Sequence, residues 1–401
     1  MLIRYGKKQD GKLIKKAMVY TREEHRINSA DVDSDAVFIT GRLRANGYES
    51  YIVGGAVRDL ILGRKPKDFD IVTSATPARI KRIFHNSRII GRRFRLVHVF
   101  FGPKIFEVST FRSLKDGHTS NTYGTIEEDV LRRDFSFNAL FYDPGKQVVV
   151  DYVNGLADIK KKRLRPIIPL EVIFRDDPVR MIRAVKYAAA TGFTVPWLVK
   201  RRIRAEASLL ADVPASRLTE ELSKIIHSPY AAGIVENLEK AGLYQYLQHE
   251  ASALLKSDPG FRGRYLGSLE HAAEAGDGGL LAALVRDYLD LGTPWDTLKK
   301  GGPEDCRAVY FDVRRFIAPM NPPRLELDKA LRLIFSNHGI ELKKRVFFER
   351  ERPGPRRKSG GTREEGYLRD GGLSREGSLP SEPGRRRRRR RAPRPGPAET
   401  T

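Results

Sequence analysis

The stretch YIVGGAVRDLILGRKPKDFDIVT, residues 51–73, decides the fold of this chain. It begins with an apolar strand, breaks at Gly54 and Gly55, and continues as a short amphipathic helix that ends at Gly63. Glycines allow the backbone to approach a ligand closely, and the first turn of a helix offers unpaired N–H groups to an anion. We therefore expect a phosphate to bind at this break.

A pair of acidic residues, Asp68 and Asp70, follows at the start of the next expected strand. Alternate residues of a strand share a face, so both carboxylates are predicted to point the same way, with Phe69 toward the core. Neighbouring carboxylates suppress each other's ionisation unless a cation lies between them, and Mg²⁺ takes oxygen ligands from carboxylates and substrate phosphates. The pattern predicts a two-Mg²⁺ site for phosphoryl transfer, and the alternative is a strand bordered by two solvated acids.

The composition indicates a strongly basic protein with a folded core. The chain has 401 residues, 40% of them hydrophobic, and a formal net charge of +24. This charge favours a polyanionic partner, which is nucleic acid or an anionic membrane on the charge alone. The single cysteine, Cys306, excludes a disulfide framework, and the sequence contains no apolar run long enough to span a bilayer. We therefore expect a cytoplasmic protein that does not enter a membrane.

Several short motifs occur together in the first half of the chain: Gly54-Gly55, Arg58-Asp59, Asp68-x-Asp70 and Arg132-Arg133-Asp134-Phe135 with Asn138. Together they resemble the class II nucleotidyltransferases, which comprise the bacterial poly(A) polymerases and the CCA-adding tRNA nucleotidyltransferases. KPKDFD and the segments 91–103, 124–135 and 176–189 look most like the poly(A) polymerase branch. The resemblance is dense over residues 47–192 and thin afterwards.

The resemblance implies an α+β fold. A small mixed-sheet head of the polymerase β type is followed by an all-helical neck and body, and then by a disordered basic tail. The expected regions are a flexible basic lead-in at 1–32, the catalytic head at 33–168, a neck that selects the nucleotide and binds RNA at 169–245, a helical body at 246–350 and the Arg-rich tail at 351–401. Within the head, strands are expected at 94–101 and 104–110.

The resemblance also implies roles for side chains of the head. Glu107 becomes a third metal ligand if its strand pairs beside the strand of Asp70. The implied catalytic residues are Asp68, Asp70, Glu107 and Asp134, and the implied nucleotide-binding residues are Gly54, Gly55, Arg58, Arg133 and Asn138. Arg133 is expected near the triphosphate, and Asp134 and Asn138 near the sugar. The alternative for Asp134 is a structural role in an ion pair.

A strong helical pattern begins at Phe174 and ends at Gly192. Asp177 and Arg180 are three residues apart, so on one helix they share a face and place an acceptor beside a fork of donors. Adenine and cytosine both present a donor next to an acceptor, whereas guanine and uracil present the reverse. We expect this pair to read the nucleotide without a template, and the alternative is a surface salt bridge.

The tail, residues 351–401, is poor in apolar residues and carries 15 Lys and Arg against 7 acidic residues. Such a composition cannot bury enough surface to fold. Its arginine run is expected to bind RNA phosphates regardless of sequence: Arg385, Arg386, Arg387, Arg388, Arg389, Arg390 and Arg391. The alternative is a solvated tail that binds nothing.

The sequence thus predicts a monomeric, template-independent polynucleotide adenylyltransferase that transfers AMP from ATP to RNA 3′ ends in mRNA processing and turnover. Its cofactor is Mg²⁺ and ATP is its substrate. A CCA-adding enzyme is the nearest alternative, because cytosine and adenine share the edge that Asp177 and Arg180 recognise. A transferase for a small acceptor and a catalytically inactive RNA-binding protein are the others. The sequence does not identify a protein partner.

Overall fold

The computed structural model describes residues 2–7, 13–91, 96–115, 122–272, 278–301 and 303–342. The chain divides into two compact units, Met1–Glu349 and Arg350–Thr401. All described residues belong to the first unit. The predicted tail, including its run of arginines, lies outside the described residues.

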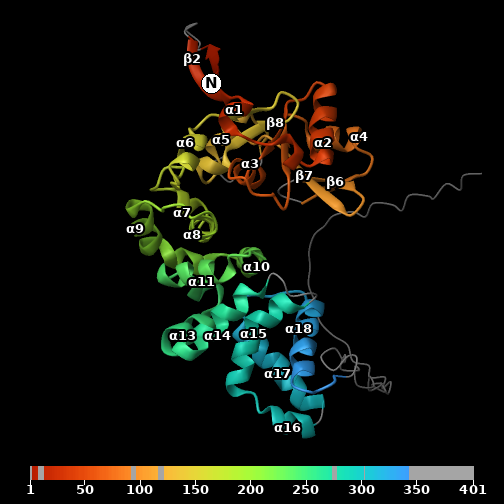
Figure 1. Ribbon diagram of the computed structural model, residues 1–401, viewed down its shortest axis with the longest axis vertical. Helices are drawn as coiled ribbons and strands as arrows, with labels where there is room; N and C mark the ends of the chain where they lie inside the picture. Colours follow the sequence, from red (N-terminus) through yellow and green to blue (C-terminus); the bar gives the residue numbers. More distant parts are fainter. Residues whose placement is uncertain are drawn as a thin grey trace, which may run out of the picture. The chain divides into compact units, whose positions relative to one another are not determined.

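The head is built on a nine-stranded sheet with the strand order β1-β2-β9-β8-β3-β4-β7-β6-β5. Its strands, red to yellow in Figure 1, are β1 Leu2–Lys7, β2 Leu13–Tyr20, β3 Ser50–Val53, β4 Asp70–Thr73, β5 Ser87–Ile90, β6 Leu96–Phe101, β7 Lys104–Thr110, β8 Leu140–Asp143 and β9 Val148–Asp151. Neighbouring strands pair antiparallel except β4 and β7, which run parallel. The predicted mixed sheet is confirmed.

The first two strands contradict the prediction of a flexible lead-in over residues 1–32. β2 adds to the sheet beside β9, with Met18 opposite Asp151 and Tyr20 opposite Val149. Met18 and Tyr20 are buried in the core of the head. The prediction was wrong because basic residues interrupt the apolar pattern of these strands and because β9, which joins β2 to the sheet, lies far along the sequence.

Both faces of the sheet carry a buried apolar layer. The first layer contains residues of α2 Ser34–Ala45, α3 Gly55–Ile61 and α4 Pro77–Ile83, and the second contains residues of α5 Ile126–Leu131. Ile52 and Ile71 belong to the first layer, whereas Val53 and Val72 belong to the second. Because side chains alternate along a strand, Asp70 lies on the same side as Val72, facing the layer that contains α5.

Two helices, α7 Ile173–Asp176 and α8 Val179–Thr191, occupy the segment that the sequence predicted as one helix. Between them Asp177 has an extended backbone, with φ −152° and ψ 96°. Pro178 explains the break, because a proline disfavours the helical conformation in the residue before it. Asp177 and Arg180 therefore do not lie on one helix face, contrary to the prediction.

The described chain after α8 is helical apart from short turns, as predicted, and is green to blue in Figure 1. The further elements are α1 Arg22–His25, η1 Ser29–Asp31, η2 Ser136–Asn138, α6 Gly155–Lys160, α9 Trp197–Glu206, η3 Ala207–Asp212, α10 Ala215–Ile226, α11 Ala231–Lys240, α12 Tyr244–Leu247, α13 His249–Ser257, α14 Pro259–Glu270, α15 Gly279–Gly292, α16 Trp295–Lys300, α17 Pro303–Phe316 and α18 Arg324–Asn337. Within the described residues, no helix has both the length and the apolar character needed to cross a membrane.

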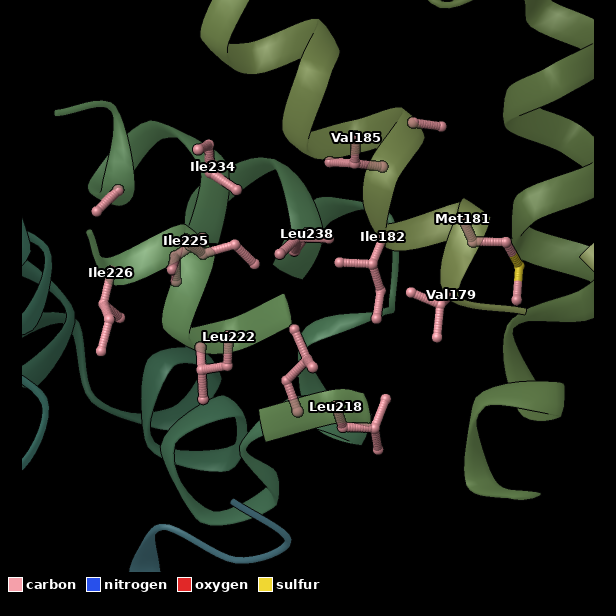
Figure 2. Packing of buried hydrophobic residues seen from close by; sticks show 14 of the residues in the cluster. Val179, Met181, Ile182, Val185, Leu218, Leu222, Ile225, Ile226, Ile234 and Leu238 are labelled. Atoms are coloured by element: carbon pink, nitrogen blue, oxygen red, sulfur yellow. The ribbon is translucent and has the colours of Figure 1, made fainter. Parts of the chain in front are cut away.

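The neck has an apolar core between α8, α10 and α11 (Figure 2). Ile182 from α8, Leu222 from α10 and Leu238 from α11 point toward one another and are fully buried. Burial of each such side chain contributes roughly 1.5–3 kcal/mol. This packing fixes α8, whose residues Arg180 and Arg183 line the pockets described below.

Candidate active site

The carboxylates predicted to bind Mg²⁺ lie near the centre of the sheet. β4 and β7 pair in parallel with Ile71 opposite Val108, so Asp70 and Glu107 are the preceding residues of the two strands. Both line one pocket, of about 730 Å³. Asp68 precedes β4 instead of lying on it, and it lines a second cavity that it shares with Asp70. The strand pairing on which the prediction for Glu107 depended is therefore present.

Asp70 is accessible to solvent but recessed among protein atoms. Desolvation by these atoms, followed by repulsion from Glu107 and Asp68, raises the pKa of its carboxyl group to about 6. Glu107 Oε1 lies 3.5 Å from His98 Nε2. Glu107 and Asp68 thus destabilise the charged form of Asp70, and a bound cation would remove this repulsion.

The donor chemistry of this acidic group fits Mg²⁺, which prefers oxygen ligands. Among the residues that the structure describes, no three His, Cys, Asp or Glu side chains are grouped closely enough to hold a metal ion on their own. Mg²⁺ is commonly bound by one or two carboxylates together with substrate phosphates. A metal at Asp70 and Glu107 would therefore take its remaining ligands from the substrate and water.

Arginine side chains surround the same pocket, and we call this space the arginine pocket. They are Arg112, Arg132, Arg133, Arg180, Arg183 and Arg217. Burial, followed by repulsion from Arg112, lowers the pKa of Arg132 to about 10. Burial also lowers the pKa of Arg180. An anion in the arginine pocket would stabilise the charged forms of Arg132 and Arg180.

The Gly54-Gly55 turn borders a smaller cavity of about 250 Å³, which shares Asp70 and several arginines with the arginine pocket. Gly54 has φ 71° and ψ −132°, a conformation that glycine adopts far more readily than other residues. A Cβ atom at Gly54 would lie 3.7 Å from Asp70 Oδ2. The predicted glycine break therefore places backbone directly beside the acidic group.

Asp134 is buried and its carboxylate is fully engaged. Its Oδ2 accepts a hydrogen bond from Arg183 Nε at 2.8 Å, and its Oδ1 accepts bonds from Phe135 N at 2.8 Å and Asn138 Nδ2 at 3.3 Å. Burial opposes its ionisation, but Arg183 and the hydrogen bonds outweigh burial and hold the pKa below its ordinary value. This geometry favours the structural role for Asp134, since the carboxylate has no oxygen without a protein donor.

The network continues through Asn138 to Arg58. Arg58 Nη1 donates to Asn138 Oδ1 at 3.0 Å, and the same guanidinium bonds Asp59. The ring of Tyr187, on α8, lies 5.2 Å from Arg58 Cζ and 5.5 Å from Arg183 Cζ. Head and neck are thus joined by a continuous polar network next to the site. Arg58 lines the cavity that contains Asp68, whereas Asn138 lines the cavity beside the glycine turn.

Asp177 and Arg180 both line the arginine pocket, but each has its own partner. Asp177 Oδ2 accepts from Arg217 Nη2 at 2.9 Å, and Asp177 Oδ1 accepts from Val179 N at 3.3 Å. Arg180 Nη1 donates to Ile173 O at 3.2 Å. Asp177 thus forms its salt bridge with Arg217, a residue of α10, and not with Arg180, the partner in the alternative that the sequence offered.

Residues that the sequence did not assign also line these cavities. Arg183 and Tyr187 follow Arg180 on α8 by three and seven residues, so they lie on the same helix face as Arg180. Helical spacing from Arg180 could therefore have identified both. Arg112 and Arg217 carry no local signal, because they reach the site only through the packing of β7 and α10. Arg133 lies in the arginine pocket, where its Nη2 also bonds Asp129 at 2.9 Å, and its place near the triphosphate stays a prediction.

Two family profiles match the chain. The first, described as the poly A polymerase head domain, matches residues 50–165. The second, described as the probable RNA and SrmB-binding site of polymerase A, matches residues 192–255. The two matches cover most of the head and the neck.

Curated relatives and a solved structure extend this similarity. Poly(A) polymerase I of Escherichia coli is 42% identical over 57% of this chain and 53% of its own length. The CCA-adding enzyme of Geobacillus thermodenitrificans is 38% identical over 53% of this chain and 54% of its own. The chain thus spans about half the length of the curated relatives it matches. The crystal structure of the Bacillus stearothermophilus CCA-adding enzyme in complex with CTP is 30% identical, with a TM-score of 0.53 over 75% of this chain and 82% of that one.

Proposed function

Because the chain belongs to the class II nucleotidyltransferases, we propose that it is a template-independent polynucleotide adenylyltransferase that adds AMP from ATP to RNA 3′ ends. Its identity to a poly(A) polymerase I, 42%, exceeds the 38% identity to a CCA-adding enzyme over similar lengths. The basic charge of +24 favours an RNA acceptor over a small one. RNA processing and turnover is the proposed setting.

The observation that carries this proposal is the gathering of like charges around one pocket. The pKa of Asp70 is raised by burial and by Glu107, while the pKa of Arg132 is lowered by burial and by Arg112. In each case burial and a neighbour of like charge disfavour the charged form. A nucleoside triphosphate with bound Mg²⁺ brings both signs at once, a cation for the carboxylates and phosphates for the arginines.

The residues divide the work of the reaction. The RNA 3′ oxygen attacks the α-phosphorus of ATP, a P–O bond forms, the bond to pyrophosphate breaks, and the hydroxyl proton passes to solvent water. Mg²⁺ bound by Asp70 together with Glu107 or Asp68, and completed by substrate oxygens and water, would stabilise charge on the attacking and leaving oxygens. Arg132 and Arg133, which line the arginine pocket, are proposed to bind the triphosphate. The Gly54-Gly55 turn lets it approach the backbone closely.

We retain Asp177 and Arg180 as the proposed readers of the base edge, with one change. Arg217 holds the Asp177 carboxylate, so Arg217 is a positioning residue for that reading. Arg58, Asp134 and Asn138 are proposed to support the nucleotide site through their network instead of contacting reacting atoms.

The test is incubation of the full chain with tRNA lacking its 3′ end and with a generic RNA, each nucleotide supplied separately with Mg²⁺. We expect AMP addition to both RNAs and little addition from CTP. Asp68→Asn and Asp70→Asn should abolish addition and leave RNA binding nearly normal. Incorporation of CMP into the truncated tRNA would instead identify a CCA-adding enzyme. RNA binding without any addition would identify an inactive RNA-binding protein.

A further inference from the structure

We propose that a cavity between the head and the neck binds the 3′-terminal nucleotides of the acceptor RNA, with Tyr230 and Arg64 as a stacking platform for one base. This inference rests on the proposed function, because it names where that reaction takes its acceptor. We call this space the neck cleft. It is about 560 Å³ and is lined by α3, by the loop that leads to Asp70, by α8, and by the segment that joins α10 to α11.

The position of the neck cleft follows from the chemistry of phosphoryl transfer. The attacking and leaving oxygens lie roughly in line on opposite sides of the phosphorus. Asp70 lines both the arginine pocket and the neck cleft, and Tyr187 lines the neck cleft and the cavity beside the glycine turn. With the triphosphate among the arginines, the acceptor hydroxyl reaches Asp70 from the other cavity. Asp68, the second acidic residue of the motif, lines that cavity as well.

The neck cleft carries an aromatic surface suited to a base. The side chain of Tyr230 is 44% exposed, although it lines a cavity. Arg64 Cζ lies 5.6 Å from the centre of this ring, and Arg64 Nη1 donates to Ala190 O at 2.8 Å, which fixes the guanidinium. Bases of single-stranded RNA stack on such exposed rings and on arginine planes without regard to sequence. This tolerance suits an enzyme whose acceptor end changes with every added nucleotide.

The charges of the neck cleft suit an RNA backbone. Within the described part of the chain, Arg64 and Lys67 donate to main-chain oxygens, of Ala190 and of His227, and the structure records no carboxylate paired with either. Lys65 is exposed to solvent in the same lining. By contrast, the lining carboxylate Asp59 is bonded to Arg58. The loop between α3 and β4 therefore presents cations that phosphates can bind.

The kinetic test compares Tyr230→Ala, Tyr230→Trp and Lys65→Ala with the wild type, using one RNA oligonucleotide. Tyr230→Ala should raise the KM for RNA about tenfold, in line with the loss of one base–aromatic stack, and should leave the KM for ATP unchanged. Tyr230→Trp should restore the RNA KM. Lys65→Ala should raise it a few-fold and reduce its salt dependence. Tyr5→Ala and Lys161→Ala, exposed residues outside the neck cleft, serve as matched controls.

A second measurement does not depend on catalysis. RNA ending in 5-iodouridine is irradiated with the full chain in the absence of ATP, and the cross-linked peptide is identified. A cross-link at Tyr230 together with no nucleotide addition would leave the neck cleft standing and overturn the proposed function. Nucleotide addition with an unchanged RNA KM in Tyr230→Ala, or with cross-links outside the neck cleft, would overturn the neck cleft alone. Equal rises in both KM values would also count against it, because they indicate a general disturbance of the site.

Discussion

Asp70→Asn should make the metal-free protein more stable at neutral pH while it abolishes nucleotide addition. The raised pKa of Asp70, about 6, means that the folded state holds a proton more tightly than the unfolded state does. The stability of the wild type therefore falls as the pH rises from about 4 to about 6, and the loss is complete above that range. Asparagine carries no charge at this position, so it avoids the loss.

The size of the effect follows from the shift. A rise from 3.8 to about 6 corresponds to about 3 kcal/mol at 1.36 kcal/mol per pKa unit. The Asp70 side chain reaches solvent, and screening by water reduces the repulsion, so we expect about 1 kcal/mol at pH 8. In a domain of this size that gain corresponds to about 2 °C in Tm. At pH 4 the two proteins should melt together.

The assay is thermal melting in EDTA at pH 4, 6 and 8, repeated at pH 8 with Mg²⁺ and ATP. Asp31→Asn, which removes an exposed acid of η1, controls for the change in net charge. Ligand binding should raise the Tm of the wild type more than that of Asp70→Asn. If Asp70→Asn melts at or below the wild-type temperature at pH 8 in EDTA, the acidic group is not under electrostatic strain and the argument for a bound cation fails.

Three further predictions concern the base-reading residues, the head–neck network and the tail. Arg180→Ala should lower the selectivity for ATP over GTP and UTP by about tenfold or more, since one bidentate contact is worth ~1–3 kcal/mol; a comparison of kcat/KM for four nucleotides decides this, and unchanged selectivity would make Arg180 structural. Arg183→Ala should lower the free energy of unfolding by about 3 kcal/mol, because it leaves Asp134 buried without its cation. The control Lys240→Ala breaks an exposed pair with Glu236 and should cost under about 1 kcal/mol, measured by thermal melting of both variants. Deletion of residues 351–401 should leave nucleotide addition to a short RNA intact. It should also reduce the slope of log K for RNA binding against log salt concentration by roughly 0.7 for each phosphate that the tail neutralises. An unchanged slope would mean that the tail does not bind the RNA.

The elements that local signals determine were predictable from the sequence. The segment 51–73 combines a strand, a glycine pair and a capped helix within a few turns, and β7 was predicted with the bounds that the structure shows, Lys104–Thr110. The alternation of Glu107 with its buried neighbours correctly predicted its face. β2 was missed because its stability depends on pairing with β9, and a strand whose partner lies more than a hundred residues away carries only a weak local signal.

Side-chain partners were less predictable than elements, for a physical reason. Asp134 bonds Arg183 and Asp177 bonds Arg217, and in both cases the partner comes from a different helix brought near by packing. Sequence spacing ranks neighbours on one helix first, so it paired Asp177 with Arg180 and overlooked the effect of Pro178 on the residue before it.

The hydrogen-bond partners of Asp177 and Arg180 decide how these two side chains are held relative to each other. Asp177 is held by Arg217 on α10, whereas Arg180 is held by the carbonyl of Ile173 on α7. The separation of the proposed acceptor and donor is therefore set by how α7 and α10 each pack against α8, not by the pitch of a single helix. Leu218, buried beside Arg217 in the neck core of Figure 2, is part of that packing. On the proposal that Asp177 and Arg180 read the base, nucleotide choice depends on neck residues that touch no nucleotide. Leu218→Ala, which leaves a cavity in the neck core, should then lower the selectivity for ATP, measured as kcat/KM for four nucleotides, while the acidic group stays intact.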